Sequence, residues 1–197
     1  MKNIPENPFD RFDAWYRQAM LHNDIEDANA VNLATSTPDG IPSNRIVLLK
    51  GHNPDGFVFF TNLSSRKGKE LEANQHAAMC FYWAPLAMQI RIEGKVVSVI
   101  DEEADQYFAS RPLRSRVGAW ASRQSRPLEN RATLLKDVAR ETARFALGEV
   151  ARPPFWSGFR LVPARMEFWK NGEYRLHDRL AYTFDESGLW QHQLLYP

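Results

Sequence analysis

The chain has 197 residues, 44% of them hydrophobic and 25% charged, which excludes fibrous and disordered proteins and fits a single domain over residues 1–197. The net charge of +1 argues against bulk binding to nucleic acid or to an anionic membrane. Cys80 is the single cysteine, so neither an intramolecular disulfide nor a cysteine-rich zinc site can form. The start, Met1 to Pro5, lacks an apolar signal region, and no stretch is long and apolar enough to span a bilayer. We therefore expect a cytoplasmic protein.

The first half of the chain predicts one helix followed by antiparallel strands. Asn7 and Pro8 are typical helix-start residues, and apolar side chains recur at helical spacing up to about residue 21. Runs rich in strand-forming residues then alternate with turn signals, and Ser64 or Ser65 opens a short helix through Glu72. The predicted strands cover residues 30–37, 41–50, 57–61, 77–83 and 88–99. Strands joined by short turns in this number favour a closed barrel over a flat sheet with exposed edges.

The second half predicts a helical segment, about residues 101–147, inserted between barrel strands. A helix from Asp101 to Ser110 is broken by Pro112, and a longer helix covers residues 128–147. Two strands, 159–169 and 174–184, flank a hairpin turn at Asn171-Gly172, and a last strand ends at Tyr196. The order helix, strands, helices, strands predicts a mainly β, antiparallel barrel with helices packed around it.

The sequence contains no glycine-rich nucleotide fingerprint, no phosphate loop and no cluster of metal ligands, so we expect no metal site. It offers instead cations and hydroxyls at the ends of elements. The segment from Thr61 to Lys67 places hydroxyls, Arg66 and Lys67 around the first turn of a helix. Free N–H groups and the helix dipole favour a phosphate there. Simple helix capping by Ser64 beside a solvated basic face explains this segment equally well.

Two further groups combine charge with hydroxyls. Arg45 and Lys50 bracket an apolar strand, where charges that block edge pairing are the favoured explanation. Tyr107 and Arg111 share a helix face and Ser115 follows the helix break, an arrangement able to bind a phosphate. A surface stack of the tyrosine on the arginine is the more ordinary explanation of that group.

Residues 169–179 form the least ordinary segment. As a strand, it would place Arg175, His177 and Arg179 on one face, which is electrostatically costly unless an anion lies there. A surface strand with salt bridges is the alternative, but the local acids are poorly placed for it. Together with the abundant aromatic residues, the four groups suggest a pocket with aromatic walls for two phosphorylated ligands.

From Pro5 to about Trp190, the sequence resembles the pyridoxine/pyridoxamine 5′-phosphate oxidase family. The motifs that carry this resemblance are Arg45-Ile-Val-Leu-Leu-Lys50, Thr61-Asn-Leu-Ser-Ser-Arg-Lys67, Ser110-Arg-Pro112, Gly118-Ala-Trp120 with Gln124-Ser125, Pro154-Phe-Trp-Ser-Gly-Phe-Arg160, and Glu167-Phe-Trp169 with Arg175-Leu-His-Asp-Arg179. The resemblance implies a split β-barrel homodimer with two FMN sites at the subunit interface.

The resemblance also implies which residues hold the ligands. Those implied to bind FMN are Arg45, Ile46, Val47, Leu48, Leu49, Lys50, Phe60, Thr61, Arg66, Lys67, Gln89, Gln124, Ser125, Trp169 and Arg179, with Arg66 and Lys67 near its phosphate. Those implied to grip the substrate phosphate are Lys50, Tyr107, Arg111 and Ser115. Arg175 and His177 would face the pyridine ring of the substrate, and Asp27 matches an acid near it. These last three are the implied catalytic residues.

The implied reaction oxidises pyridoxamine or pyridoxine 5′-phosphate to pyridoxal 5′-phosphate. A hydride passes from the substrate to FMN, and O₂ reoxidises the flavin to give hydrogen peroxide. Some positions depart from the family pattern: Phe60 stands where many members have Tyr, and Met88 replaces a polar residue. The C-terminal segment lacks the arginine usual in the family, and the N-terminal segment is short. These two differences argue against a secondary product-binding site and leave catalysis intact.

Two other functions compete with this interpretation. A related FMN oxidase of phenazine-type biosynthesis shares the fold, but Asp178 and the intact run from Arg45 to Lys50 favour the vitamin B6 enzyme. A non-catalytic flavin- or pyridoxal phosphate-binding protein would not need both phosphate-binding groups together with Arg175 and His177. Nucleic-acid binding is disfavoured by the net charge of +1.

Overall fold

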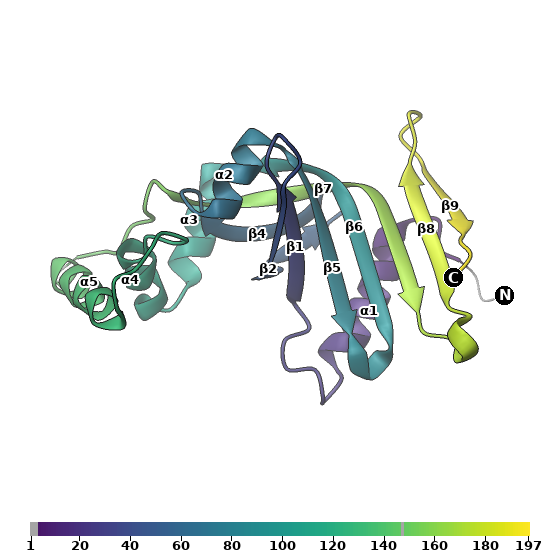
Figure 1. Ribbon diagram of the computed structural model, residues 1–197, viewed down its shortest axis with the longest axis horizontal. Helices are drawn as coiled ribbons and strands as arrows, with labels where there is room; N and C mark the ends of the chain where they lie inside the picture. The colour runs from purple at the N-terminus through teal and green to yellow at the C-terminus, as the bar shows by residue number, and fades with distance from the viewer. Residues whose placement is uncertain (1–3, 147) are drawn as a thin grey trace.

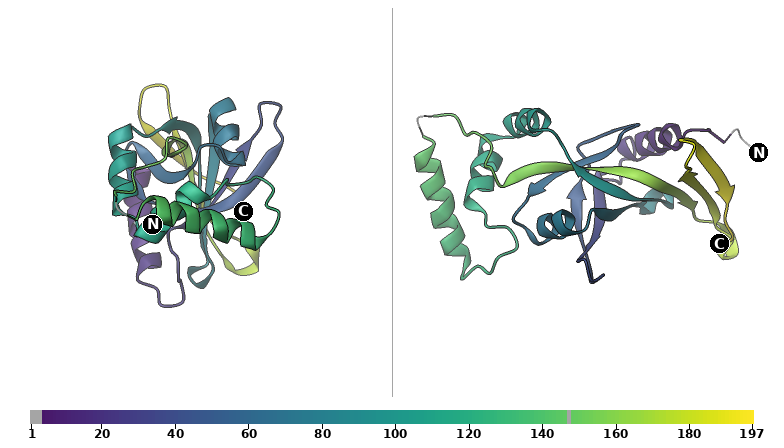
Figure 2. Two further views of the ribbon diagram at one scale, coloured as in Figure 1. Left: turned by 90° about the vertical axis from the view of Figure 1, so that its left-hand side faces the viewer. Right: turned by 90° about the horizontal axis from the view of Figure 1, so that it is seen from above.

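The computed structural model describes residues 4–146 and 148–197, and a curled antiparallel sheet forms its centre (Figure 1, Figure 2). The helices are α1 (Pro8–Met20), α2 (Arg66–Ala73), α3 (Asp101–Ser110), α4 (Leu113–Ala121) and α5 (Arg131–Arg144), with 3-10 turns η1 (Ala84–Leu86) and η2 (Glu173–Arg175). The strands are β1 (Ala30–Ser36), β2 (Pro42–Leu48), β3 (Gly51–Asn53), β4 (Gly56–Asn62), β5 (His76–Trp83), β6 (Met88–Ser98), β7 (Trp156–Lys170), β8 (Asp178–Phe184) and β9 (Trp190–Leu194). Helices α4 and α5 form one end of the elongated molecule, and β8 and β9 form the other (Figure 1).

The strands follow the order β2-β1-β5-β6-β7-β4-β3, and β8 and β9 extend the sheet from β7. Neighbouring strands pair antiparallel. The order begins with β2 and ends with β3, which are separated in the chain by only Leu49 and Lys50. The two strands at the ends of this path are therefore joined by a two-residue connection, which brings the two edges of the curled sheet together. The predicted mainly β, antiparallel split barrel with helices packed around it is confirmed.

Helix α1 packs its apolar stripe against the barrel. As predicted, Asn7 caps it, accepting a hydrogen bond from the Phe9 N–H at 2.9 Å. Phe12 is fully buried, and its ring centroid lies 4.8 Å from that of Phe57 and 5.6 Å from that of Phe81. Burying one such ring stabilises the fold by about 1.5–3 kcal/mol, so this contact fixes the helix on the barrel wall.

A bulge between β6 and β7, with Ala164 of β7 as the extra residue, fixes the register of the two strands. The pairing shifts between Glu93 and Gly94, where the two backbones come unusually close. A Cβ atom at Gly94 would lie 2.0 Å from the carbonyl oxygen of Val162, so this position requires glycine. Past the bulge, Gln89 lies opposite Trp169. The bulge thus decides which side chain of β6 faces which side chain of β7.

The helical segment differs from its prediction in two places. Pro112 ends α3 as predicted, but it also serves as the N-cap residue of α4, a helix that was not predicted. The helix predicted over residues 128–147 begins only at Arg131, because the Asn130 side chain caps it there. Its predicted end at Leu147 lies outside the described residues. Within the described ranges, no helix is long and apolar enough to cross a membrane.

The strand predicted over residues 174–184 begins later than expected. Tyr174 and Arg175 have φ angles of 54° and 65°, in the left-handed region that a strand cannot contain. They belong to the turn η2, and β8 begins only after it. The prediction that Arg175, His177 and Arg179 share one face of a strand is therefore wrong, because a left-handed turn separates the first of them from the strand.

Candidate active site

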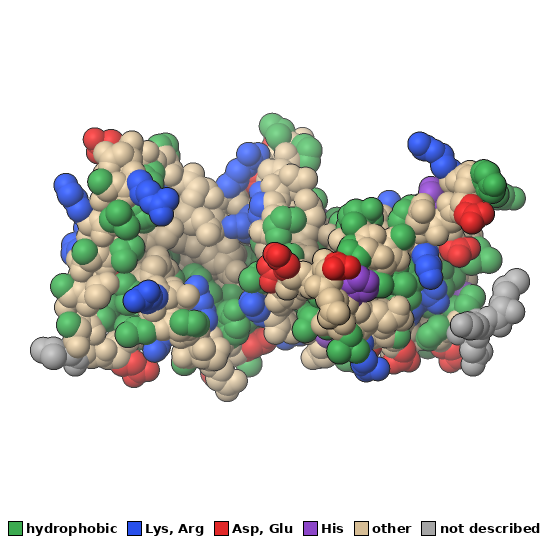
Figure 3. All heavy atoms as spheres, turned by 90° about the horizontal axis from the view of Figure 1, so that it is seen from below, with side chains coloured by type: hydrophobic (Ala, Val, Ile, Leu, Met, Phe, Trp, Pro, Cys, Tyr) green, Lys and Arg blue, Asp and Glu red, His purple; other side chains and the backbone are tan. Residues whose placement is uncertain are grey.

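A cavity of about 560 Å³ opens between the barrel and the helical end of the molecule. Figure 3 shows a hollow between the helical end, at the left, and the barrel, with Lys and Arg side chains along its wall. The cavity is lined by Arg45, Ile46, Val47, Leu48, Lys50, Phe60, Thr61, Asn62, Lys67, Tyr107, Arg111, Ser115, Gly118, Ala119, Ser122, Gln124 and Trp156. Most residues predicted for the cofactor and all those predicted for the substrate phosphate therefore meet in one cavity.

Lys67 is the most deeply placed cation of the cavity. Its side chain is buried, and Nζ donates to Thr61 Oγ1 (3.1 Å), Ser65 Oγ (3.3 Å) and Gln124 Oε1 (2.8 Å). Burial and the nearby charge of Arg45 lower the pKa of Lys67 to about 8. Gln124 Oε1 also accepts a hydrogen bond from Thr61 at 3.2 Å. Because that oxygen is occupied, the amide N–H₂ group is the part of Gln124 left to donate to a ligand.

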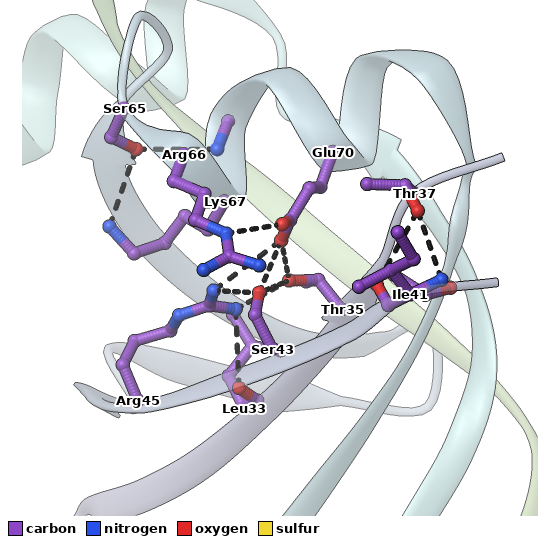
Figure 4. A network of polar contacts seen from close by, with 12 residues as sticks. Leu33, Thr35, Thr37, Ile41, Ser43, Arg45, Ser65, Arg66, Lys67 and Glu70 are labelled. Atoms are coloured by element: carbon purple, nitrogen blue, oxygen red, sulfur yellow. Dashed lines mark hydrogen bonds and ion pairs between the residues drawn. The ribbon is translucent and has the colours of Figure 1, made fainter. Parts of the chain in front are cut away.

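The carboxylate of Glu70 connects two further cations next to this cavity (Figure 4). Its Oε1 accepts from Arg66 Nε at 2.8 Å, and its Oε2 lies 3.4 Å from Arg45 Nη2. Oε2 also accepts hydrogen bonds from the hydroxyls of Thr35 and Ser43. Glu70 itself is buried and does not line the cavity. It was missed by the sequence predictions, although its spacing of four residues from Arg66 is a detectable helix-pair signal.

Aromatic rings form another wall of the cavity. The rings of Phe60, Tyr107 and Trp156 pack against one another, with centroids 4.1 Å (Phe60–Tyr107), 5.4 Å (Phe60–Trp156) and 6.1 Å (Tyr107–Trp156) apart. The Arg111 guanidinium lies 4.8 Å from the Trp156 centroid. Its Nη1 is buried without a hydrogen-bond partner among the described residues, and burial lowers the pKa of Arg111. A buried, unpartnered guanidinium N–H beside a cavity fits an anionic ligand. Lys50 Nζ lies 5.9 Å from the Tyr107 centroid.

Three predicted cofactor residues lie apart from this cavity, in one row across three strands. Gln89 of β6 is opposite Trp169 of β7, which is opposite Arg179 of β8. The His177 ring lies 4.7 Å from the Trp169 ring, and its Nδ1 accepts a hydrogen bond from a backbone N–H. Arg179 is paired with Glu167 at 2.9 Å. The row thus adds an amide, an indole and a paired guanidinium to one face of the sheet.

A second cavity, of about 790 Å³, is lined by both Asp27 and Gln89 and shares Ile46 with the first. Ile46 is 61% exposed, so its side chain lies on the surface between the two cavities.

Among the other predicted site residues, Leu49 points into the core and Ser125 lines a hollow beside α5. No group of three His, Cys, Asp or Glu within the part of the chain that the structure describes is placed to hold a metal ion.

Several lining residues were not given a site role from the sequence. They are Asn62, Gly118, Ala119, Ser122 and Trp156. Four of them fall within or next to quoted motifs, and the three on or just after α4 depend on a helix that was not predicted. Only the close approach of α4 to β4 in the folded chain brings them to the cavity.

Comparison with known proteins decides the family. Residues 19–144 match the family model "Pyridoxamine 5′-phosphate oxidase", and residues 156–197 match "Pyridoxine 5′-phosphate oxidase C-terminal dimerisation region". The chain belongs to the pyridoxine/pyridoxamine 5′-phosphate oxidase family. Within it, the chain is 54% identical over 196 residues to the pyridoxine/pyridoxamine 5′-phosphate oxidase of Rhodospirillum rubrum, covering 97% of this chain and 96% of that protein. The corresponding protein of Chelativorans is 51% identical, with 96% and 90% covered.

Solved structures agree with this membership in the family. A structure of PhzG from Burkholderia lata, in complex with tetrahydrophenazine-1-carboxylic acid, has a TM-score of 0.92 and 33% identity, with 99% of this chain and 95% of that chain covered. A pyridoxamine 5′-phosphate oxidase-related, FMN-binding protein from Nostoc punctiforme has a TM-score of 0.73 at 16% identity, with both chains fully covered. The second likeness supports the fold alone.

Proposed function

We propose that this protein is an FMN-dependent oxidase that converts pyridoxamine 5′-phosphate and pyridoxine 5′-phosphate to pyridoxal 5′-phosphate, with O₂ as the acceptor. One observation carries the proposal. A single cavity gathers Lys67 and Arg45 on one set of elements and Tyr107, Arg111 and Ser115 on another. Two groups of phosphate-binding side chains in one cavity fit a phosphorylated cofactor together with a phosphorylated substrate.

The donor set around Lys67 fits the phosphate of FMN. Lys67 has only neutral oxygen partners, and Arg45 and Arg66 share the single carboxylate of Glu70, so the cluster keeps an excess of positive charge. Residues 45–50, from β2 and the connection that follows it, together with Phe60, Thr61 and the Gln124 amide would hold the rest of the cofactor. When bound, FMN supplies the redox chemistry by taking a hydride from the substrate and passing the electrons to O₂, which becomes hydrogen peroxide.

The substrate phosphate would bind to Lys50, Tyr107, Arg111 and Ser115. Arg111 is oriented before any ligand arrives, because its guanidinium lies against Trp156 and Phe108. Its unpartnered Nη1 gains a hydrogen bond only when an anion is present. Binding the phosphate at fixed side chains orients the other end of the substrate, which is the main contribution that protein groups make to a hydride transfer.

Arg175, His177 and Asp27 would act on the pyridine end of the substrate. None of them lines the first cavity, and Gln89, Trp169 and Arg179 also lie outside it. A homodimer, which the match of residues 156–197 to a dimerisation region supports, would bring the row on β6, β7 and β8 of one subunit to the cavity of the other. The site is then complete only in the dimer, with Arg175 clamping the ring and stabilising negative charge.

The direct test is an anaerobic mixture of the purified protein, FMN and pyridoxamine 5′-phosphate, followed by the yellow flavin absorbance. We expect the colour to bleach and to return when air is admitted, which would establish both half-reactions. Flavin that binds but stays yellow would contradict the assignment for this substrate and favour a non-catalytic binding protein.

A second candidate follows from the likeness to PhzG, whose bound tetrahydrophenazine-1-carboxylic acid carries a carboxylate and no phosphate. An enzyme for such a substrate would have no need of a phosphate grip at Tyr107, Arg111 and Ser115. The same anaerobic mixture with this tricyclic acid separates the two candidates. Bleaching by the tricyclic acid and not by pyridoxamine 5′-phosphate would establish the second.

A further inference from the structure

Glu70 stands out because it is a buried carboxylate with many donors that lines neither of the two cavities described above. It lies on α2 with 6% of its surface exposed, and four side chains from three elements converge on it (Figure 4). Ser43 donates to Oε2 at 2.6 Å and Arg66 donates to Oε1 at 2.8 Å. Thr35 and Arg45 complete the set at Oε2. A carboxylate with this many donors is held in one orientation.

The two arginines attach to Glu70 in different ways. Arg45 reaches it mainly through two hydroxyls, because Nη1 donates to Thr35 Oγ1 and Nη2 to Ser43 Oγ, and both hydroxyls donate onward to the carboxylate. Arg66 uses Nε alone among its contacts with the described residues, and its side chain is 58% exposed. The outer edge of the Arg66 guanidinium is therefore left for a ligand, while Arg45 is fixed at the cavity wall.

The charges of this cluster do not cancel. Arg45, Arg66 and Lys67 lie around one carboxylate, which leaves an excess of two positive charges. A phosphate monoester carries about −1.5 to −2 at neutral pH. Glu70 stays ionised in this range: burial opposes its ionisation, but hydrogen bonds from Ser43, Thr35 and Arg66 outweigh burial and bring its pKa to about 2.

We propose that Glu70 is a positioning residue that assembles the FMN phosphate site before the cofactor arrives, by holding Arg45 and Arg66 in place and by limiting the cluster to the charge of one phosphate dianion. This inference rests on the proposed function, because it takes the phosphate to be that of FMN. Without Glu70, three cations would face one another in a half-buried site, and their repulsion would drive the two arginines apart. The affinity lost should then be confined to the phosphate end of the cofactor.

A purely structural role is the competing explanation, since Glu70 also ties α2 to β1 and β2. The two explanations differ in what happens to riboflavin, which has the flavin ring and no phosphate. A structural defect would weaken FMN and riboflavin alike. A positioning defect would weaken FMN and spare riboflavin.

The experiment is a pair of titrations of the cofactor-free, full-length protein with FMN and with riboflavin, followed by quenching of flavin fluorescence. We expect the natural protein to prefer FMN, and Glu70→Gln to lower this preference about tenfold or more, the loss typical of a charged hydrogen bond. Glu72→Gln, which changes an exposed glutamate on the same helix, is the matched control and should keep the full preference.

Ser43→Ala provides a second variant in case Glu70→Gln fails to fold. It removes one hydroxyl between Arg45 and Glu70, leaves every charge in place and lies at a half-buried position. A several-fold loss of the FMN preference is expected. An unchanged or larger preference for FMN in Glu70→Gln, or in Ser43→Ala if Glu70→Gln does not fold, would overturn the role of Glu70. Failure of the natural protein to prefer FMN over riboflavin would instead overturn the proposed cofactor site itself.

Discussion

Glu70 and Glu167 are two of the buried glutamates that hold arginines in this protein, and they do so differently. Glu70 is surrounded by two hydroxyls and two arginines next to the cavity. Glu167 on β7 is 2% exposed and lies within 3.5 Å of Arg91, Arg165 and Arg179 on three adjacent strands. Around Glu70, hydroxyls satisfy much of the carboxylate, so the arginines keep unpaired charge. Around Glu167 the close partners are arginines: Arg179 donates to Oε1, whereas Arg91 and Arg165 lie near Oε2 as ion pairs without a hydrogen bond.

The balance of charge explains what each cluster can do. Near Glu167, Arg91 also pairs with Glu93 at 3.2 Å, so three arginines face two carboxylates. The Glu70 cluster has three cations and one carboxylate. The nearly balanced cluster cross-links strands, and the unbalanced one is suited to an anion. A buried glutamate with its arginines can therefore either cross-link strands or bind an anion. Which of the two it does depends on how many of the partners of the carboxylate are hydroxyls and how many are arginines.

The largest expected effect is on the cluster of Glu167. Glu167→Gln should lower the free energy of unfolding by about 3–5 kcal/mol, because it leaves three arginines around a buried, uncharged amide. Denaturant unfolding at fixed protein concentration measures it. Glu93→Gln is the control, since the Arg91–Glu93 pair is partly exposed and should contribute less than about 1 kcal/mol. Equal effects of the two changes would show that burial does not distinguish the two carboxylates.

The Glu70 cluster should reveal itself in acid. In the folded protein the pKa of Glu70 is about 2, below the ordinary value of 4.5. The stabilisation of the fold by ionised Glu70 is therefore complete above about pH 4.5 and is lost as pH falls toward 2. The shift corresponds to about 3 kcal/mol. Unfolding of Glu70→Gln should therefore depend less on pH in this window than unfolding of the natural protein or of Glu72→Gln. If the free energy of unfolding depended on pH in the same way for all three proteins, Glu70 would not contribute to the acid response.

Arg111 extends the comparison of the two clusters, because its guanidinium is held by aromatic rings and not by a carboxylate. Arg111→Lys keeps the charge but loses the planar contact with Trp156 and the paired donors. We expect kcat/KM for pyridoxamine 5′-phosphate to fall about 10- to 100-fold, with FMN affinity unchanged. Steady-state kinetics with saturating FMN measure it, and Arg114→Lys at an exposed position is the control. Loss of FMN from the variant would place Arg111 in the cofactor site.

The smallest effect concerns Lys67, whose pKa of about 8 places its titration in an accessible range. As pH rises through this value, Lys67 loses its charge, so the affinity for FMN should fall, by about tenfold for each pH unit above 8. Titrations between pH 7 and 9.5 measure the slope, in a range where the phosphate charge is constant. Lys67→Arg keeps its charge throughout and should give a flat profile. A flat profile in the natural protein would exclude Lys67 as a phosphate ligand.

The sequence predicted the barrel well because strand alternation, turn residues and helix caps are local signals. Asn7 and Ser65 cap their helices as their residue types suggest. The α4 helix was missed because a proline that ends one helix can also begin the next. The turn at Tyr174 and Arg175 was missed because nothing in a Glu-Tyr-Arg run requires left-handed backbone. Glu70 was missed because its role depends on Thr35 and Ser43, which only the packing of α2 on the barrel brings to it.

The bulge at Gly94 has a consequence for how the chain tolerates changes in length. Gln89 faces Trp169 because the strand is counted from that bulge. Removing one residue between the two would put an aliphatic neighbour of Gln89 opposite the indole and turn the amide to the other face of the sheet. One-residue insertions and deletions should therefore be excluded between Gly94 and Gln89, because they would change which side chain of β6 lies opposite Trp169.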